Sequence, residues 1–211
     1  MGIAHVCFVK TPGLTPAKTR LAADIGTQKA EELYKLLLQR CMKISHNMNH
    51  SYFALNEAQA RHHSLWSREK VYIQKGNTLA EKLRNAEDYF LKYFQAVIFW
   101  GADCPSLRLQ DFINLRESLK KHHHAIIPAQ DGGFVAYAAK VPLAEKWLNV
   151  KMSSHTTLHD LRNQLKGPFK LLDQRSDLDE IQDIAQVLKD MNLHPSKDPK
   201  WQEIKDLLSI L

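Results

Sequence analysis

The apolar run Ile3–Val9, interrupted only by His5, is the feature of the sequence that most constrains the fold. A strand that is apolar on both faces is typical of a parallel sheet covered by helices on both sides. The tripeptide Thr11-Pro12-Gly13 follows almost at once. Proline cannot continue a strand ladder and glycine tolerates a sharp turn, so we expect the strand to end in a loop there. The run therefore predicts an α/β fold with a buried, mainly parallel sheet.

Strand-like and helix-like segments alternate along the rest of the chain. Thr78 and Glu81 have the spacing of a capping box, and Gly167-Pro168 has the order of residues that closes a helix. Because there is no internal repeat or low-complexity linker, the alternation predicts one three-layer α/β/α domain over residues 1–211. Further strands are expected at residues 52–55, 71–73, 96–100, 125–127, 133–139 and 169–172. Helices are expected at residues 28–44, from 78 to about 94, 109–121, 157–166, 179–191 and 200–211.

The composition limits the partners and the cellular setting. A net charge of +6 permits an anionic partner, but the cationic residues are spread along the chain without an arginine-rich tract. A phosphorylated small molecule needs no more charge than this, so we expect no nucleic-acid partner. Cys7, Cys41 and Cys104 lie far apart, and no apolar run approaches the length of a membrane span or a secretion signal. These features favour a cytoplasmic protein.

The loop after the first strand carries Lys18 and Arg20, two residues apart. In an extended loop these side chains would point the same way, and two cations aimed at one spot suit a diphosphate or triphosphate. The alternative is a solvated basic loop. Neither GxxxxGK[ST] nor GxGxxG follows the strand, so the sequence lacks both of those phosphate-binding motifs.

Asp103 follows the expected strand at residues 96–100, after Gly101 and before Pro105. Ligands of open α/β sheets collect at the carboxyl ends of the strands. A carboxylate there could bind a Mg²⁺ or Mn²⁺ ion that bridges phosphates. Alternatively, Asp103 caps the helix that follows Pro105.

Two further aspartate motifs follow strands. Asp131-Gly132-Gly133 could be a simple hairpin turn, or Asp131 could face the same site as Asp103. Asp177 and Asp179 follow the last expected strand. Asp179 could begin a helix, with Gln182 completing a capping box, or it could supply the second metal carboxylate. His155 and His159 lie one helical turn apart but lack the glutamate of HExxH and a third ligand, so a zinc site is not favoured.

Five ordered blocks, spanning about residues 3 to 190, resemble the bacterial glycosyltransferase-like proteins linked to arsenosugar biosynthesis. The blocks are residues 10–21, 74–81, 101–105, 128–134 and 177–183. The resemblance implies a glycosyltransferase-A (nucleotide-diphospho-sugar transferase) type fold, which is related to that of nucleotidyltransferases. Two blocks depart from the family pattern. Phe134 stands where tyrosine is usual and precedes Val135-Ala-Tyr-Ala-Ala139, and residues 179–183 read Asp-Glu-Ile-Gln-Asp.

The resemblance also implies roles for single residues. Lys18 and Arg20 would contact the donor phosphates. Asp103 and Asp179 would hold the divalent metal, Mg²⁺ or Mn²⁺, and Asp131 would face the sugar or the acceptor. The motifs add further expected substrate-binding residues, namely Lys10, Pro12, Gly13, Gly101, Gly132 and Gly133.

Three functions are compatible with these residues. The first is a metal-dependent glycosyltransferase that takes a nucleoside-diphosphate sugar and a small-molecule acceptor. The metal, Lys18 and Arg20 would stabilise the leaving diphosphate, and Asp131 would act as general base. The second is a nucleotidyltransferase that joins an NTP to a phosphorylated metabolite and releases pyrophosphate. The third is a non-catalytic nucleotide-binding module that acts through a partner.

Overall fold

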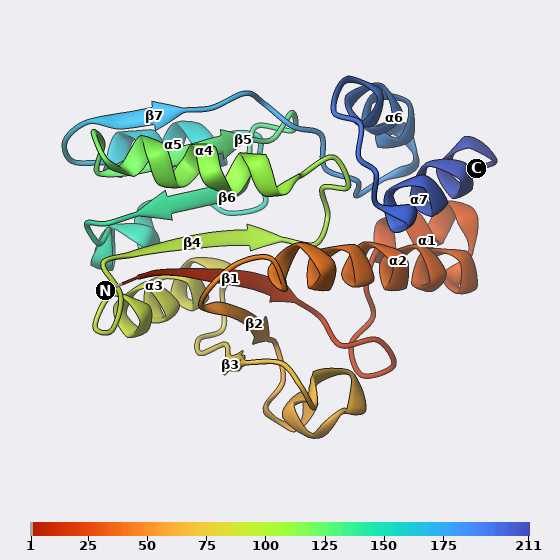
Figure 1. Ribbon diagram of the computed structural model, residues 1–211, viewed down its shortest axis with the longest axis horizontal. Coiled ribbons are helices and arrows are strands. Elements are labelled where there is room, and N and C mark those ends of the chain that lie inside the picture. The colour runs from red at the N-terminus through yellow and green to blue at the C-terminus, as the bar shows by residue number, and fades with distance from the viewer. Residues whose placement is uncertain (1) are drawn as a thin grey trace.

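A seven-stranded sheet forms the centre of the protein (Figure 1). The computed structural model describes residues 2–211. The strand order across the sheet is β3-β2-β1-β4-β6-β5-β7. The strands are β1 (Ile3–Val9), β2 (Ser51–Leu55), β3 (Val71–Ile73), β4 (Ala96–Gly101), β5 (His124–Pro128), β6 (Phe134–Ala139) and β7 (Phe169–Leu171).

The sheet is mainly parallel, as the sequence predicts. β1 pairs in parallel with β2 and β4, β2 with β3, and β5 with β7. Only β6 runs antiparallel to its neighbours, β4 and β5. In Figure 1 the arrows of β1 and β4 point to the same side and that of β6 points to the opposite side. β5 is therefore parallel to β4, and their carboxyl ends meet at one edge of the sheet.

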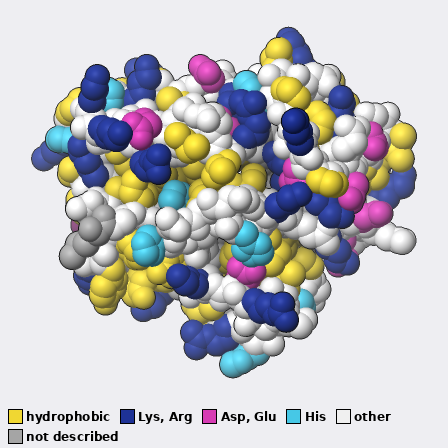
Figure 2. Space-filling view, viewed as in Figure 1, with side chains coloured by type: hydrophobic (Ala, Val, Ile, Leu, Met, Phe, Trp, Pro, Cys, Tyr) yellow, Lys and Arg dark blue, Asp and Glu magenta, His cyan; other side chains and the backbone are white. Residues whose placement is uncertain are grey.

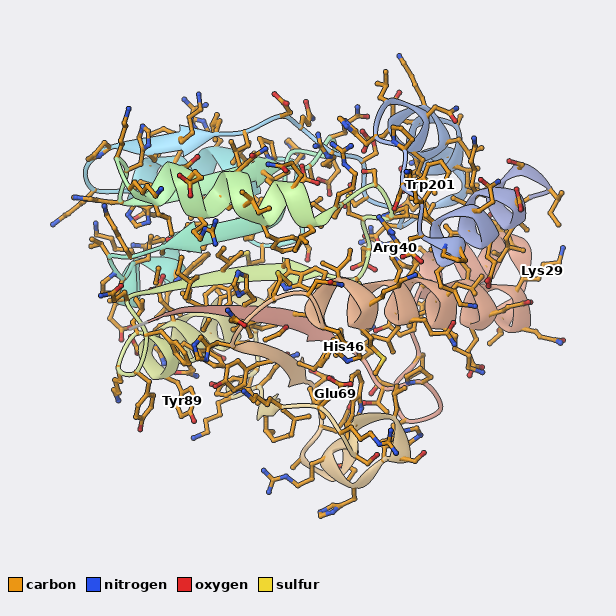
Figure 3. All side chains as sticks on the ribbon, viewed as in Figure 1. Lys29, Arg40, His46, Glu69, Tyr89 and Trp201 are labelled. Atoms are coloured by element: carbon orange, nitrogen blue, oxygen red, sulfur yellow. The ribbon has the colours of Figure 1, made fainter. Side chains whose placement is uncertain are left out.

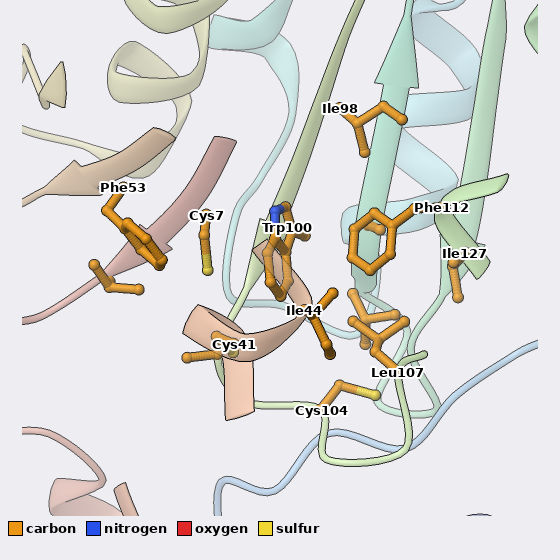
Figure 4. Packing of buried hydrophobic residues seen from close by; sticks show 14 of the residues in the cluster. Cys7, Cys41, Ile44, Phe53, Ile98, Trp100, Cys104, Leu107, Phe112 and Ile127 are labelled. Atoms are coloured by element: carbon orange, nitrogen blue, oxygen red, sulfur yellow. The ribbon is translucent and has the colours of Figure 1, made fainter. Parts of the chain in front are cut away.

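Helices cover both faces of the sheet, which confirms the predicted α/β/α layering. On one face, α2 and α4 pack on a core that includes Cys7, Trp100 and Phe112 (Figure 4). On the other face, α3, α5 and the 3₁₀ turn η3 pack on a core that includes Phe99 and Tyr137. The helices are α1 (Thr19–Ile25), α2 (Thr27–Ser45), α3 (Leu79–Phe90), α4 (Leu109–Leu119), α5 (Thr157–Gln164), α6 (Ile184–Leu193) and α7 (Pro199–Ser209). The 3₁₀ turns are η1 (Ala58–His62), η2 (Ser64–Trp66), η3 (Ala144–Asn149) and η4 (Ile181–Asp183).

A third apolar cluster joins α1, α2, α6 and α7 beyond the carboxyl ends of β1 and β4 (Figure 1). Arg40 on α2 anchors this part of the protein, and Figure 3 labels it beside the C-terminal helices. Its guanidinium donates to the carbonyl oxygens of Pro105 (2.8 Å) and Leu107 (2.6 Å) and pairs with Asp198 (3.0 Å). The loop that carries Asp103 is thereby fixed to α2 and α7.

Two predicted helix starts have different outcomes. Thr78 accepts the Glu81 N–H while Glu81 accepts the Thr78 N–H, so the predicted capping box of α3 is confirmed. The box predicted at Asp179 and Gln182 is wrong: the carboxylate of Asp183 accepts the N–H groups of Asp179 (2.8 Å) and Glu180 (2.7 Å). The 3₁₀ turn η4 occupies this segment, and the regular helix begins only at Ile184.

Surface charge and helix hydrophobicity are the two remaining properties that bear on possible partners. On the face shown in Figure 2, Lys and Arg side chains are spread among Asp and Glu and do not form a continuous stripe. Within residues 2–211, no helix combines the length and apolar character that crossing a membrane would require.

Candidate functional site

A cavity of about 710 Å³ opens at the carboxyl ends of the strands. Segments that follow β1, β2, β3, β4 and β5 all contribute to its wall. Its volume lies in the range of small-molecule and cofactor sites. Most of the residues predicted from the sequence line it: Lys10, Lys18, Arg20, Gly101, Asp103, Asp131, Gly133 and Asp179, together with Asp177.

Lys18 is the centre of the charged part of the cavity. Its side chain is only 2% exposed, and its Nζ contacts Asp103 Oδ1, the carbonyl oxygen of Leu178 and Asp179 Oδ1, the last at 3.2 Å. Burial alone would lower the pKa of Lys18, but the charges of Asp103 and Asp179 outweigh it, so the pKa lies above its ordinary value. The ammonium therefore stays charged and joins two segments that are far apart in sequence.

The prediction of an extended loop with Lys18 and Arg20 side by side is wrong. Helix α1 begins at Thr19, and Lys18 is its N-cap in the left-handed conformation, with φ 53° and ψ 40°. This bend turns Lys18 inward, whereas Arg20 is 64% exposed and pairs with Glu180 at 3.3 Å. Both residues still line the cavity.

Asp103 does not cap a helix, so that alternative is wrong. Helix α4 begins at Leu109 with Arg108 as its N-cap, and the Arg108 N–H is accepted by Asp111 at 2.8 Å. The side chain of Asp103 is 49% exposed and pairs with Lys18. Its carboxylate therefore faces the cavity without serving the backbone of α4.

The segment of Asp177 and Asp179 is fixed directly against Asp103. The Leu178 N–H donates to the carbonyl oxygen of Asp103 at 2.9 Å. Burial, followed by repulsion from Asp131 and Asp179, raises the pKa of Asp177 to about 7. The cavity thus concentrates carboxylates, a condition that favours a bound cation.

Asp131 lies in the connection between β5 and β6. Both interpretations of Asp131-Gly132-Gly133, a hairpin turn and a carboxylate on the same side as Asp103, apply. The turn is a hairpin connection, and Asp131 also lines the cavity. Asp131 Oδ1 accepts the Gly133 N–H at 2.8 Å, which fixes the carboxylate in a side-chain turn. Gly132, with φ 90°, is packed so closely that a Cβ would lie 2.1 Å from the carbonyl oxygen of His155.

Three residues predicted to bind substrate are not part of the cavity wall: Pro12, Gly13 and Gly132. The N–H groups of Leu14 and Thr15 both donate to the carbonyl oxygen of Thr11 at 3.1 Å, so the loop folds into a tight turn. Pro12 instead lines a separate surface groove against α2 and η2. Gly132 is turned toward the 151–156 loop, and its carbonyl oxygen accepts the N–H of Leu158, at the start of α5, at 2.8 Å.

Sequence reasoning missed several polar residues of the cavity. Asn56 and Gln74 follow β2 and β3, and Lys82 on α3 donates to the Asn56 side chain. The position of Asn56 and Gln74 at strand ends was the signal that could have found them.

Tyr34 on α2 binds both the N–H (2.8 Å) and the carbonyl oxygen (3.0 Å) of Lys10, which fixes the start of the loop; nothing in the local sequence indicates this contact. The opposite end of the wall is formed by Phe134, Val135, Met152, Ser153, Ser154, His155 and Thr157.

The donor set fits a divalent cation that is shared with phosphate. Asp103 and Asp179 both reach one point, which Lys18 Nζ marks. Mg²⁺ and Mn²⁺ need only one or two carboxylates when phosphate oxygens complete their shell. Among residues 2–211, no group of three or more His, Cys, Asp or Glu side chains could hold a metal by itself. The arrangement therefore suits a metal–nucleotide complex better than a metal held by protein ligands alone.

The strand order and the flanking helices define an α/β fold similar to that of nucleotide-diphospho-sugar transferases. A proposed nucleotide-diphospho-sugar transferase from Desulfovibrio desulfuricans has a similar structure, with a TM-score of 0.82 and 21% identity over 100% of this chain and 98% of that one. CMP:2-keto-3-deoxy-manno-octonic acid synthetase in complex with CTP has a TM-score of 0.54 and 11% identity, over 92% and 100% of the two chains. Rv0371c from Mycobacterium tuberculosis, in complex with manganese, has a TM-score of 0.54 and 13% identity, over 90% and 99%. At these identities the likeness establishes the fold.

The chain belongs to the family described as "Uncharacterized protein conserved in bacteria (DUF2064)", whose model matches residues 38–154, more than half of the chain. The matched range includes the segments of Asp103 and Asp131 and lies after Lys18 and Arg20. No curated protein matches the chain significantly. The fold that the sequence resemblance implies is thus confirmed. The link to arsenosugar biosynthesis, which also comes from that resemblance, stays a prediction for this chain.

Proposed function

We propose that the protein is a metal-dependent glycosyltransferase that uses a nucleoside-diphosphate sugar as donor. One observation carries the proposal: Lys18, Asp103 and Asp179 come from three distant segments and meet at one point of the cavity. A diphosphate and a divalent cation need this combination of a cationic side chain and oxygen ligands. Core packing gives no reason to bring these charges together.

The cations of the first loop would bind the donor diphosphate. Arg20 is largely exposed and its pairing with Glu180 at 3.3 Å is a surface contact, which contributes little stability. The Arg20 guanidinium can therefore leave the Glu180 carboxylate and bind phosphate oxygens of the donor instead. The metal, held by Asp103 and Asp179, would supply positive charge beside the leaving diphosphate. Lys10, whose Nζ donates to the carbonyl oxygen of Pro16 at 2.9 Å, adds a further cation to the wall.

The nucleoside and the acceptor would occupy opposite ends of the cavity. Asn56 and Gln74 offer amide groups at the β2–β3 end, where the edges of a nucleobase could be recognised. At the other end, Asp131 Oδ1 is held by the Gly133 N–H, so Oδ2 remains to accept the proton of an acceptor hydroxyl. The hydroxyl oxygen would bond to the anomeric carbon as the bond from that carbon to the diphosphate breaks. The arsenosugar link of the resembled proteins makes an arsenic-containing acceptor the first to test.

A thermal-shift panel of nucleotides, with and without Mn²⁺, tests this proposal. A ligand that binds only the folded state raises stability by about 2.7 kcal/mol when its concentration is 100 times its Kd. We expect nucleoside diphosphates with Mn²⁺ to raise the melting temperature more than either component does alone. If no nucleotide shifts the melting temperature with or without metal, the cavity is not a nucleotide site and the proposal fails.

Nucleotidyl transfer is the second candidate, favoured by the fold similarity to a synthetase that binds CTP. The products separate the two reactions. A glycosyltransferase releases a nucleoside diphosphate from a nucleotide sugar, whereas a nucleotidyltransferase releases pyrophosphate from a nucleoside triphosphate. If the protein binds nucleotides but releases neither product with any of a broad set of acceptors, the non-catalytic nucleotide-binding module is favoured.

A further inference from the structure

We propose that Lys18 acts as an internal cation that occupies the metal position in the nucleotide-free protein, and that metal binding releases Lys18 to bind the phosphates. The inference depends on the metal site of the proposed function and adds to it a competition between a protein side chain and the metal. Through this competition, binding of the metal and binding of the nucleotide are coupled.

The hydrogen bonds of Lys18 carry the inference. A lysine ammonium has three N–H donors and no acceptor. In this structure Nζ contacts three oxygens: Asp103 Oδ1, the Leu178 carbonyl oxygen and Asp179 Oδ1. All three donors are therefore engaged, and none is left for a phosphate oxygen. Lys18 can bind the donor diphosphate only after it gives up one of these partners.

The exposure of the groups indicates which partner can be given up. The Lys18 side chain is only 2% exposed, whereas the side chains of Asp103 and Asp179 are 49% and 50% exposed. A hydrated divalent cation can thus reach both carboxylates from the cavity without unfolding the loop. Two positive charges cannot share these oxygens at such short range without strong repulsion, so the metal and the ammonium exclude each other.

The backbone of Lys18 shows that the inward position is held by its contacts. Lys18 is a left-handed N-cap without a side-chain bond to its own helix. A residue with a Cβ adopts this conformation at a cost, which the surrounding contacts must offset. When the metal takes the carboxylates, the reason for this conformation is removed, and the side chain is free to turn toward the diphosphate. Metal and nucleotide binding would then be mutually favourable through one lysine.

The test is the affinity of the nucleotide-free protein for Mn²⁺, measured by electron paramagnetic resonance of the free ion. Lys18→Met keeps an unbranched side chain, shorter by only the terminal nitrogen, and removes the competing charge. Lys10→Met is the matched control, because it removes one cation from the same cavity wall without touching Asp103 or Asp179. We expect Lys18→Met to bind Mn²⁺ about tenfold more tightly than wild type, and Lys10→Met to stay within about threefold. Equal or weaker Mn²⁺ binding by Lys18→Met overturns the inference.

A second measurement on the wild-type protein avoids any folding defect of the variant. Acylation of lysines, followed by mass spectrometry, should find Lys18 protected without metal and more reactive when Mn²⁺ is added. Unchanged protection would contradict the release of Lys18. The two proposals fail separately: if wild type binds Mn²⁺ and nucleotide but Lys18→Met shows no tighter metal binding, only the competition fails. If neither protein binds Mn²⁺, with or without UDP, GDP or CTP, the metal site of the proposed function fails as well.

Discussion

Glu87, on α3, provides a stability prediction that follows directly from burial. It is fully buried, and its Oε2 accepts the N–H groups of Leu143 (2.7 Å) and Ala144 (3.2 Å) and the indole N–H of Trp147 (3.1 Å). Its other oxygen, Oε1, is buried and has no hydrogen-bond partner among the described residues. Burial outweighs the three donated bonds and raises the pKa of Glu87 to about 7.

The direction of the pH effect follows from this shift. Because the folded-state pKa lies above the unfolded value of 4.5, the folded protein holds its proton more tightly than the unfolded chain. The contribution of Glu87 to stability is therefore fully present below about pH 4.5 and is lost as the pH rises through about 7. A shift of this size corresponds to about 3 kcal/mol in the free energy of unfolding.

Glu87→Gln removes the titration and keeps a carbonyl oxygen that can accept the same N–H groups. Urea unfolding between pH 4.5 and 8.5 should show the wild-type protein losing about 3 kcal/mol relative to the variant as the pH rises. Asp88→Asn is the matched control, since Asp88 is the adjacent carboxylate and is exposed. A constant difference between Glu87→Gln and wild type across this pH range would refute the argument from burial.

Three further substitutions test one proposed phosphate contact and two structural contacts that position the loops around the cavity. Arg20→Ala should weaken binding of UDP or GDP by about 1.5–3 kcal/mol in calorimetric titration while leaving the fold intact; unchanged affinity would make Arg20 a surface charge. Arg40→Met should lower the free energy of unfolding by about 1–3 kcal/mol in urea, because it leaves the carbonyl oxygens of Pro105 and Leu107 without their donor, while Asp198 keeps its ion pair with Lys43 at 2.9 Å. Gly132→Ala should destabilise by more than about 1 kcal/mol, since its φ is 90° and a Cβ would meet the backbone of His155. Gly101→Ala, whose Cβ would make only an ordinary contact, is the control in the same thermal unfolding assay.

The strand pattern made the location of the cavity predictable. The continuous apolar run of β1 and the carboxyl ends of β4 and β5 were enough to bring the segments of Asp103 and Asp131 to one edge of the sheet. Hydrophobic periodicity and strand order are properties of sequence segments, so they can be read from the chain directly. The capping box of α3 is local in the same sense and was also predictable.

Other features depend on a short helix with a weak periodic signal, on contacts between distant segments, or on competition between neighbouring acceptors, and the sequence did not reveal them. Helix α1 has a single buried residue, Leu21, so it gives little periodic signal. Lys18 turns inward because Asp103 and Asp179, more than 80 residues away in sequence, supply its acceptors. The 3₁₀ turn at Asp183 replaced the predicted cap because the carboxylate of Asp183 takes two N–H groups in one turn. Local propensity cannot decide such competition between acceptors.

The role of Asp103 as a metal ligand is the central claim, and calorimetric titration of the nucleotide with and without Mn²⁺ tests it most directly. Asp103→Asn keeps the shape of the side chain and removes its charge. Asp131→Asn removes another carboxylate of the same cavity and serves as the matched control. We predict that Asp103→Asn lowers the Mn²⁺-dependent affinity for the nucleotide by at least about tenfold, whereas Asp131→Asn changes it by less than about threefold. Equal Mn²⁺-dependent affinity in Asp103→Asn and wild type would contradict the metal role of Asp103 and, with it, the main support for a metal-dependent transferase.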